Sequence, residues 1–304
     1  MHFRRLLFAA LVSAALATQP ALAIEGPSPF QPGSSTGSPS GALPPPGMYL
    51  VLDVEYADGT LRDNNGNKVP VFGWKSAVTP IILIVYKKPV FGATYGWYIV
   101  QPLVAEGVDA TAVGGGRAVA HGFANTTFSP LNLSWALPPN LHAKLGFAVQ
   151  PPDGTYLHAG TGAAAHQLPQ SPGNYTWTYE PDAAVSWLRG GWNLTAHAVF
   201  DFQTRDTVTN YQSGNVFYLD LTAMKTTGKW TVGLVGNVSQ QFTDDVQNGA
   251  RVGSGNRFAH DLLGPVAVVD FGRAGSLKLD ALHGFRATND LNVSFYHIQY
   301  ATKL

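Results

Sequence analysis

The sequence has no cysteine, little charge and no apolar run that could form a membrane-spanning helix. Without cysteine, disulfides, thiolate metal ligands and cysteine nucleophiles are excluded. Charged residues make up 12% of the chain, about half the share usual in soluble domains. The strongest apolar run after the N-terminal region, residues 78–86, is short and contains Pro80. If this chain spans a bilayer, we expect it to do so with strands.

Signatures of catalysis and of cofactor binding are also missing. No G-x-S-x-G motif lies in a strand-to-helix elbow, because the match at residues 33–37 falls in the segment rich in proline, glycine and serine. The histidines after the N-terminal region lack the paired spacing of a zinc site. Asp244 and Asp245, with Asn248 and Gly249, do not follow the rhythm of an EF-hand. We therefore expect neither an enzyme, nor a cofactor, nor a metal site.

The first residues have the pattern of an export signal. Arg4 and Arg5 precede an apolar run over residues 6–17, and Ala21-Leu22-Ala23 is a small-x-small cleavage site. The alternative, a first transmembrane helix, would need roughly 20 apolar residues. We predict cleavage after Ala23. The mature chain then has 17 basic and 19 acidic residues, a net charge of −2, which gives no footprint for nucleic acid.

Residues 24–46 are rich in proline, glycine and serine. Such a composition buries too little apolar area to offset the entropy lost on ordering, so it predicts a flexible linker. The alternatives are a periplasmic tether or a plug that enters the lumen of a barrel. Residues 47–304 would form that barrel.

From residue 47 onward, apolar residues recur with a period of two, the spacing of a strand with one apolar face. The clearest strands cover residues 128–137, 142–150, 175–188, 192–203, 216–224 and 230–241. Weaker runs lie at residues 48–56, 81–87, 95–104, 265–271, 277–285 and 291–300. Together, these clear and weaker segments predict an all-β, antiparallel transmembrane β-barrel of about 12 strands.

Aromatic residues favour a membrane barrel over a soluble β-sandwich, which also alternates. They bracket the strands at a spacing of about ten residues, which corresponds to a rise of about 25 Å, the height of the apolar band of outer-membrane barrels. The predicted aromatic girdle comprises Trp135, Trp177, Trp187, Trp192, Phe200, Phe202, Trp230 and Phe242.

The faces opposite the apolar ones carry Asn, Thr, Ser, Gln and a few charges, as expected for a wet, narrow lumen. By this parity, the candidate lumen-lining residues are His197, Asp201, Asp220, Asn237, Lys278 and Asp280. They could select solutes, or they could pair with one another because charges avoid lipid.

Several short peptides together resemble a known family. They are GALPPPG at 41–47, PDGTY at 152–156, TWTYEP at 176–181, NYQSG at 210–214 and QFTDD at 241–245. The chain resembles, from about Pro44 to Tyr300, the family labelled meta-pathway phenol degradation, also called SphA-like. The resemblance implies a transmembrane barrel often encoded with aromatic-degradation functions, and it implies no catalytic residues. One departure is the non-aromatic C-terminal residue Leu304, because outer-membrane barrels commonly end in an aromatic residue.

The first functional hypothesis is a channel in the outer membrane of a Gram-negative bacterium, with passive uptake of small hydrophobic or aromatic compounds. Its partners would be outer-membrane lipid, these solutes and the barrel-assembly machinery. The alternatives are a structural or adhesive surface barrel with a plugged lumen, and a soluble exported β-sheet domain that binds a ligand.

Overall fold

The computed structural model describes residues 30–304, so the predicted signal peptide lies outside the described residues. The long strands are β1 (Gly47–Arg62), β2 (Lys68–Val85), β3 (Thr94–Val100), β4 (Leu103–Asp109), β5 (Arg117–Phe123), β6 (Thr127–Leu137), β7 (Leu141–Gln150), β10 (Thr178–Arg189), β11 (Trp192–Gln203), β13 (Val216–Thr227), β14 (Trp230–Gln241), β17 (Ala259–Asp270), β18 (Ser276–Thr288) and β19 (Asp290–Lys303). Short pieces are β8 (His158–Ala159), β9 (His166–Gln167), β12 (Tyr211–Gln212), β15 (Val246–Gln247), β16 (Ala250–Arg251) and the 3₁₀ turns η1 (Thr111–Val113), η2 (Gly162–Ala164) and η3 (Gly272–Ala274). In residues 30–304, no helix is both long and apolar enough to span a bilayer.

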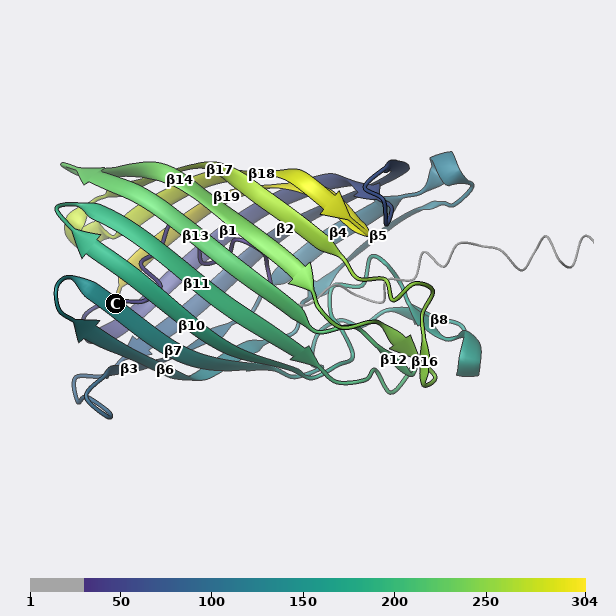
Figure 1. Cartoon of the computed structure of the whole chain (residues 1–304), viewed down its shortest axis with the longest axis horizontal. Helices are drawn as coiled ribbons and strands as arrows, with labels where there is room; N and C mark the ends of the chain where they lie inside the picture. The colour runs from purple at the N-terminus through teal and green to yellow at the C-terminus, as the bar shows by residue number, and fades with distance from the viewer. Residues whose placement is uncertain (1–29) are drawn as a thin grey trace, which may run out of the picture.

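The long strands form one antiparallel barrel (Figure 1). β1 pairs with β19 on one side and with β2 on the other, so the sheet closes on itself. β3 with β4, and β5 with β6, are each one wall strand with an interruption, which gives 12 strands around the circumference. Closure pairs the backbone groups that would otherwise be exposed to lipid. The predicted all-β barrel and its strand number are confirmed.

The interruptions lie side by side in the wall. β2 pairs with β4 along residues 72–78 and with β3 along residues 81–85. Pro80, which has no N–H, lies opposite the break, where the Gln101 amide donates to the Pro80 carbonyl at 3.2 Å. Prolines and Gly73 also obscure the alternation of residues 68–80, which explains why the predicted strand at 81–87 is much shorter than β2.

The two ends of the barrel differ. Turns at one end are short, such as residues 138–140, 190–191 and 228–229, and the C-terminus lies at this end (Figure 1). Three connections at the other end, residues 151–177, 204–215 and 242–258, are much longer and fold over it as a cap that contains β8, β9, β12, β15 and β16. Outer-membrane barrels have short periplasmic turns and longer extracellular loops. The cap therefore marks the extracellular end.

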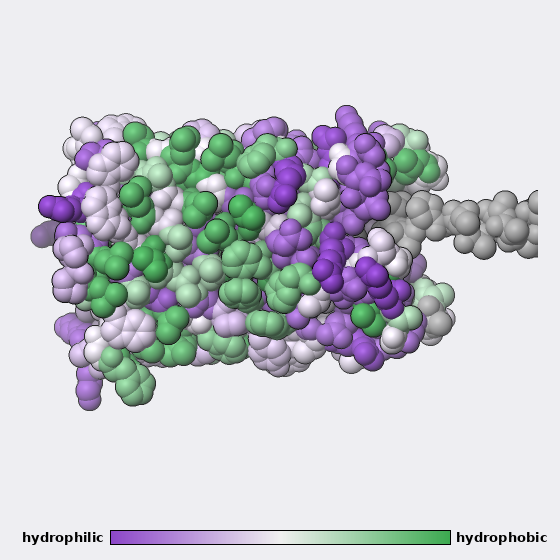
Figure 2. Space-filling view, in the orientation of Figure 1, coloured by the Kyte–Doolittle hydropathy of each residue, from purple (hydrophilic) through white to green (hydrophobic). Residues whose placement is uncertain are grey.

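An apolar belt surrounds the barrel. Figure 2 shows hydrophobic residues over most of the visible wall and hydrophilic ones concentrated at the capped end. On β11 the alternation is regular: Leu194 is 42% exposed, whereas its neighbour Thr195 is buried. A continuous apolar surface of this extent is not compatible with a soluble domain, because water would meet it all round. The outward face is the face that lipid covers.

Candidate functional site: the plugged lumen

Residues 30–46, called the plug below, lie inside the barrel and hydrogen-bond to its inner wall. The carboxylate of Asp220 on β13 accepts the backbone amides of Gly33 and Ser35, each at 3.0 Å, and the Ser35 hydroxyl at 2.7 Å. Farther along, Thr222 accepts the amide of Gly37 at 2.9 Å. The chain is thus tied to side chains that face the lumen.

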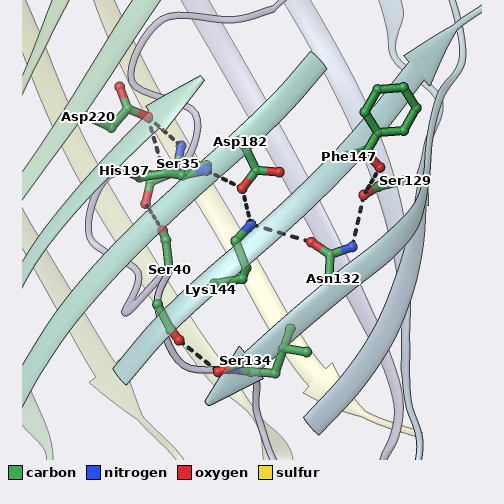
Figure 3. A network of polar contacts seen from close by, with 12 residues as sticks. Ser35, Ser40, Ser129, Asn132, Ser134, Lys144, Phe147, Asp182, His197 and Asp220 are labelled. Carbon is green, nitrogen blue, oxygen red and sulfur yellow. Dashed lines mark hydrogen bonds and ion pairs between the residues drawn. The ribbon is translucent and has the colours of Figure 1, made fainter. Parts of the chain in front are cut away.

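The periplasmic half of the plug is bound in the same way. The hydroxyl of Ser186 on β10 accepts the Gly41 amide at 2.9 Å, and the Ser134 hydroxyl on β6 donates to the Gly41 carbonyl at 2.7 Å. Figure 3 shows the plug beside Ser134. The inward-facing polar side chains of β6, β7, β10, β11 and β13 are called the anchor wall below.

Three glycines spaced four residues apart explain the close fit. Gly33, Gly37 and Gly41 each donate their amide to the anchor wall, and Gly33 and Gly37 have φ near +80°. A Cβ at Gly33 would lie 2.7 Å from a methyl group of Leu282, and one at Gly41 would lie 2.6 Å from a backbone nitrogen. A side chain at Gly33 or Gly41 would therefore displace the plug from its present position.

A charged network stabilises the anchor wall behind the plug (Figure 3). Asp182 on β10 accepts from Lys144 at 2.6 Å and from His197 at 2.9 Å, and all three side chains are buried. The other imidazole nitrogen of His197 lies 2.8 Å from the Ser35 hydroxyl. Since Ser35 also donates to Asp220, the network joins the buried charges of the wall to the plug.

The lumen has an apolar side as well. Its buried residues, called the apolar patch below, are Ala57, Met224, Val235, Leu262, Val266, Leu282 and Phe295. The patch faces the glycines of the plug, because Leu282 and Val266 are the side chains that a Cβ at Gly33 or Gly37 would meet. Lys278, at its edge, donates to the Thr36 carbonyl at 2.9 Å. The plug lies between hydrogen-bonding and hydrophobic surfaces.

All six predicted lumen residues have buried side chains in the barrel strands. His197 and Asp220 belong to the plug contacts, and Asn237 donates to Asp220 at 2.7 Å. Lys278 lies 3.2 Å from Asp280 and also holds the plug. The sixth, Asp201, has 0% exposure and lies farther toward the cap, away from that network.

Sequence reasoning missed Lys144, Asp182, Ser186 and Thr222. Parity could have found them, because each alternates with outward apolar residues on its strand. The predicted girdle residues lie on or beside barrel strands, at two levels. Trp135, Trp187, Trp192 and Trp230 lie near the short turns, and Trp177, Phe200, Phe202 and Phe242 lie near the cap.

Two expectations need correction. A flexible linker does not describe residues 30–46, because hydrogen bonds to the anchor wall hold them; the alternative of a plug does. The inward faces are also less polar than the expected wet, narrow lumen, since the apolar patch lines part of the lumen. The patch escaped detection because strands such as β17 are apolar on both faces, and parity then gives no signal.

The cap is closed around a buried carboxylate. Asp245 accepts the Tyr211 hydroxyl at 2.5 Å, the Gly214 amide at 2.8 Å and the Gln241 side chain at 2.7 Å. Burial raises the pKa of Asp245 above its ordinary value, and these hydrogen bonds oppose the rise. The cap therefore contains a titratable group in its interior.

Comparison with known proteins agrees with this architecture. Residues 59–291 match the family model described as "Putative MetA-pathway of phenol degradation". The chain belongs to this family. Among curated proteins, none matches the sequence.

Solved structures show the same fold at low sequence identity. One is the COG4313 outer membrane channel from Pseudomonas putida F1, with a TM-score of 0.74 and 14% identity over 90% of this chain and 100% of that one. Another is the translocator domain of the autotransporter NalP from Neisseria meningitidis, with a TM-score of 0.53 and 11% identity over 85% and 88% of the two chains. This member of the phenol-degradation family is an outer-membrane β-barrel.

Proposed function

We propose that the protein is a channel for passive uptake of small hydrophobic or aromatic compounds across the outer membrane. The apolar patch is the observation that carries the proposal. Seven buried apolar side chains line part of the lumen, and a pore for polar solutes would not need such a lining. Apolar solutes partition onto such a surface without an energy source. The family description and the similar channel from Pseudomonas putida support the same assignment.

The plug would be the gate of this channel. Its contacts with the anchor wall are hydrogen bonds, each of which contributes modestly because water can replace the partner. Displacing the plug would expose the apolar patch on one side and the polar anchor wall on the other. No chemical reaction is assigned to the lumen, and insertion would depend on the barrel-assembly machinery.

Flux measurements test the proposal. Purified protein in liposomes should accelerate equilibration of toluene and phenol relative to protein-free liposomes, and the D220A variant should accelerate it further. Equal rates with and without the wild-type and variant proteins would overturn the proposal. Growth of cells on a panel of aromatic and aliphatic compounds, with and without the protein, would then define the range of solutes.

A second candidate is a structural barrel whose lumen is permanently closed. The observation that favours it is the plug itself, which is held at both Asp220 and Ser186 and fits closely around three glycines. Under this candidate D220A would alter stability and leave every flux unchanged. The liposome experiment therefore separates the two.

A further inference from the structure

The outermost described residue of the plug, Phe30, occupies an apolar cluster that is separate from the apolar patch. Val199, Val216, Tyr218 and Phe258 form this cluster, and Phe30 packs against it. The ring centroids of Phe30 and Tyr218 are 4.8 Å apart, within the range of favourable aromatic pairs. Tyr218 is 2% exposed, so Phe30 lies in an enclosed space.

This space is just beneath the cap. Val199 lies in the outer half of β11, Val216 begins β13 at its outer end, and Phe258 ends the cap loop 242–258. The Phe258 carbonyl accepts the Gln241 amide at 2.9 Å, which fixes that loop to the wall. A solute that passes the cap would reach this cluster before the apolar patch.

A buried carboxylate adjoins the cluster. Asp201 follows Val199 on the same face of β11, and its Cα is paired with that of Val216. Among the described residues, no side chain hydrogen-bonds to either of its carboxylate oxygens, and its polar neighbours include the buried carboxyl group of Glu180 and the backbone amide of Phe30. The Thr178 hydroxyl and the Gln203 amide nitrogen nearby also lack partners in this part of the chain.

We propose that Phe30 holds the place of the transported solute, and that this cluster with Asp201 binds a small aromatic ring carrying a hydroxyl group. The inference rests on the proposed function and adds the location and the chemistry of the first binding site. The ring would stack on Tyr218 where Phe30 now lies. The hydroxyl would donate to a carboxyl oxygen of Asp201, which gains a partner for a buried polar atom that no side chain of the described residues contacts.

The solute ring and Phe30 of the plug compete for the same space, so binding of the solute is coupled to release of the plug. A solute in the cluster excludes Phe30, so it binds the state in which the end of the plug is free. Binding that favours one state shifts the population toward that state. Since the plug continues from Phe30 to the Asp220 contacts at Gly33 and Ser35, release would begin at this end.

Binding is measured with the mature chain in lipid nanodiscs, by ¹⁹F NMR of 4-fluorophenol and 4-fluorotoluene against empty nanodiscs. We expect the phenol to bind roughly tenfold more tightly than the toluene. F30A should tighten the binding of both by roughly fivefold, the value of one aromatic pair. F30L, which keeps apolar bulk in the cluster, should bind both about as wild type does.

D201L isolates the role of the carboxylate. It should abolish the preference for 4-fluorophenol while keeping the affinity for 4-fluorotoluene, and heat-modifiable migration on a gel confirms that the variant is folded. An undiminished phenol preference in D201L would overturn the inference. So would equal affinities of wild type and F30A.

A cysteine reporter tests the coupling to the plug. The chain has no cysteine, and Thr36 is fully buried in the plug, so T36C should react slowly with a water-soluble maleimide. Phenol should accelerate labelling severalfold more than toluene at equal concentration. If the protein accelerates flux through liposomes but shows neither the binding preferences nor the faster labelling, the proposed channel function is supported and this inference is wrong. If the solutes bind as expected but no flux is measured, the proposed channel function is wrong instead.

Discussion

The anchor wall and the apolar patch hold the same plug by different means. The anchor wall offers acceptors, with Asp220 alone taking two backbone amides and one hydroxyl. The patch offers methyl groups, with Leu282 and Val266 close to the glycines. Hydrogen bonds specify the position of a chain, whereas apolar contacts tolerate sliding. The difference teaches that hydrogen bonds fix the plug on one side of the lumen, whereas only apolar contacts meet it at Leu282 and Val266.

The largest effect should come from Asp220 of the anchor wall. D220A removes the acceptor of the Gly33 and Ser35 amides, so we expect the plug contacts to weaken by about 4 kcal/mol. Conductance in planar bilayers should rise severalfold. L282A on the apolar patch is the matched control, because it opens a cavity but removes no acceptor. Equal conductance increases in both variants would contradict the assigned roles of the two surfaces.

The second-largest effect is expected on the lipid-facing side of the strands that form the anchor wall. Leu194 on β11 faces lipid, and L194R should cost about 3 kcal/mol of folding free energy and hinder insertion. N193R, at the neighbouring half-buried position near the rim, should cost much less. Urea titration of both variants in lipid vesicles measures the difference. Similar losses would show that the wall does not separate lipid from lumen at this strand.

A smaller effect is expected at the glycine side of the plug. G33A places a Cβ 2.7 Å from Leu282 and fixes a residue at φ +80°, which costs about 1–2 kcal/mol. The plug should then be released more often, seen as faster maleimide labelling of T36C. P39A, elsewhere in the plug, is the control. Unchanged labelling in G33A would mean that the patch yields to accommodate the methyl group.

The smallest effect concerns the cap, which covers both surfaces. The folded pKa of Asp245 is raised, so the folded cap binds this proton more tightly than an unfolded loop does. Binding of this proton stabilises the folded cap fully at pH values below the unfolded pKa of about 4. This stabilisation is lost as the pH rises through the pKa of Asp245 in the folded cap. Protection factors of residues 242–258, which divide out the intrinsic pH dependence of amide exchange, should therefore be larger at pH 4 than at pH 7.

The variant D245N should remove this pH dependence, because the amide does not titrate in that window. A pH dependence that persists in D245N would assign the effect to another group of the cap. If cap opening at pH 7 also left T36C labelling unchanged, the cap and the plug would open independently.

Sequence reasoning captured those strands that alternate. On β11 every second residue faces lipid, so both Leu194 and His197 could be assigned to their faces. Parity failed for β17, where Leu262 and Val266 face inward and apolar Leu263 faces outward. The order of the plug could not be predicted for another reason. Its composition suits a linker, and its order comes from Asp220 and Ser186, more than 140 residues away in the sequence.

The sequence by itself determined that strands rather than helices span the membrane, how many there are and which of their faces meets lipid, because these properties follow from local periodicity. The tertiary structure decided what fills the lumen. Only closure of the barrel brings Gly33 between Asp220 and Leu282 and Gly41 against Ser186, since contacts across a lumen depend on register and curvature that no local pattern records.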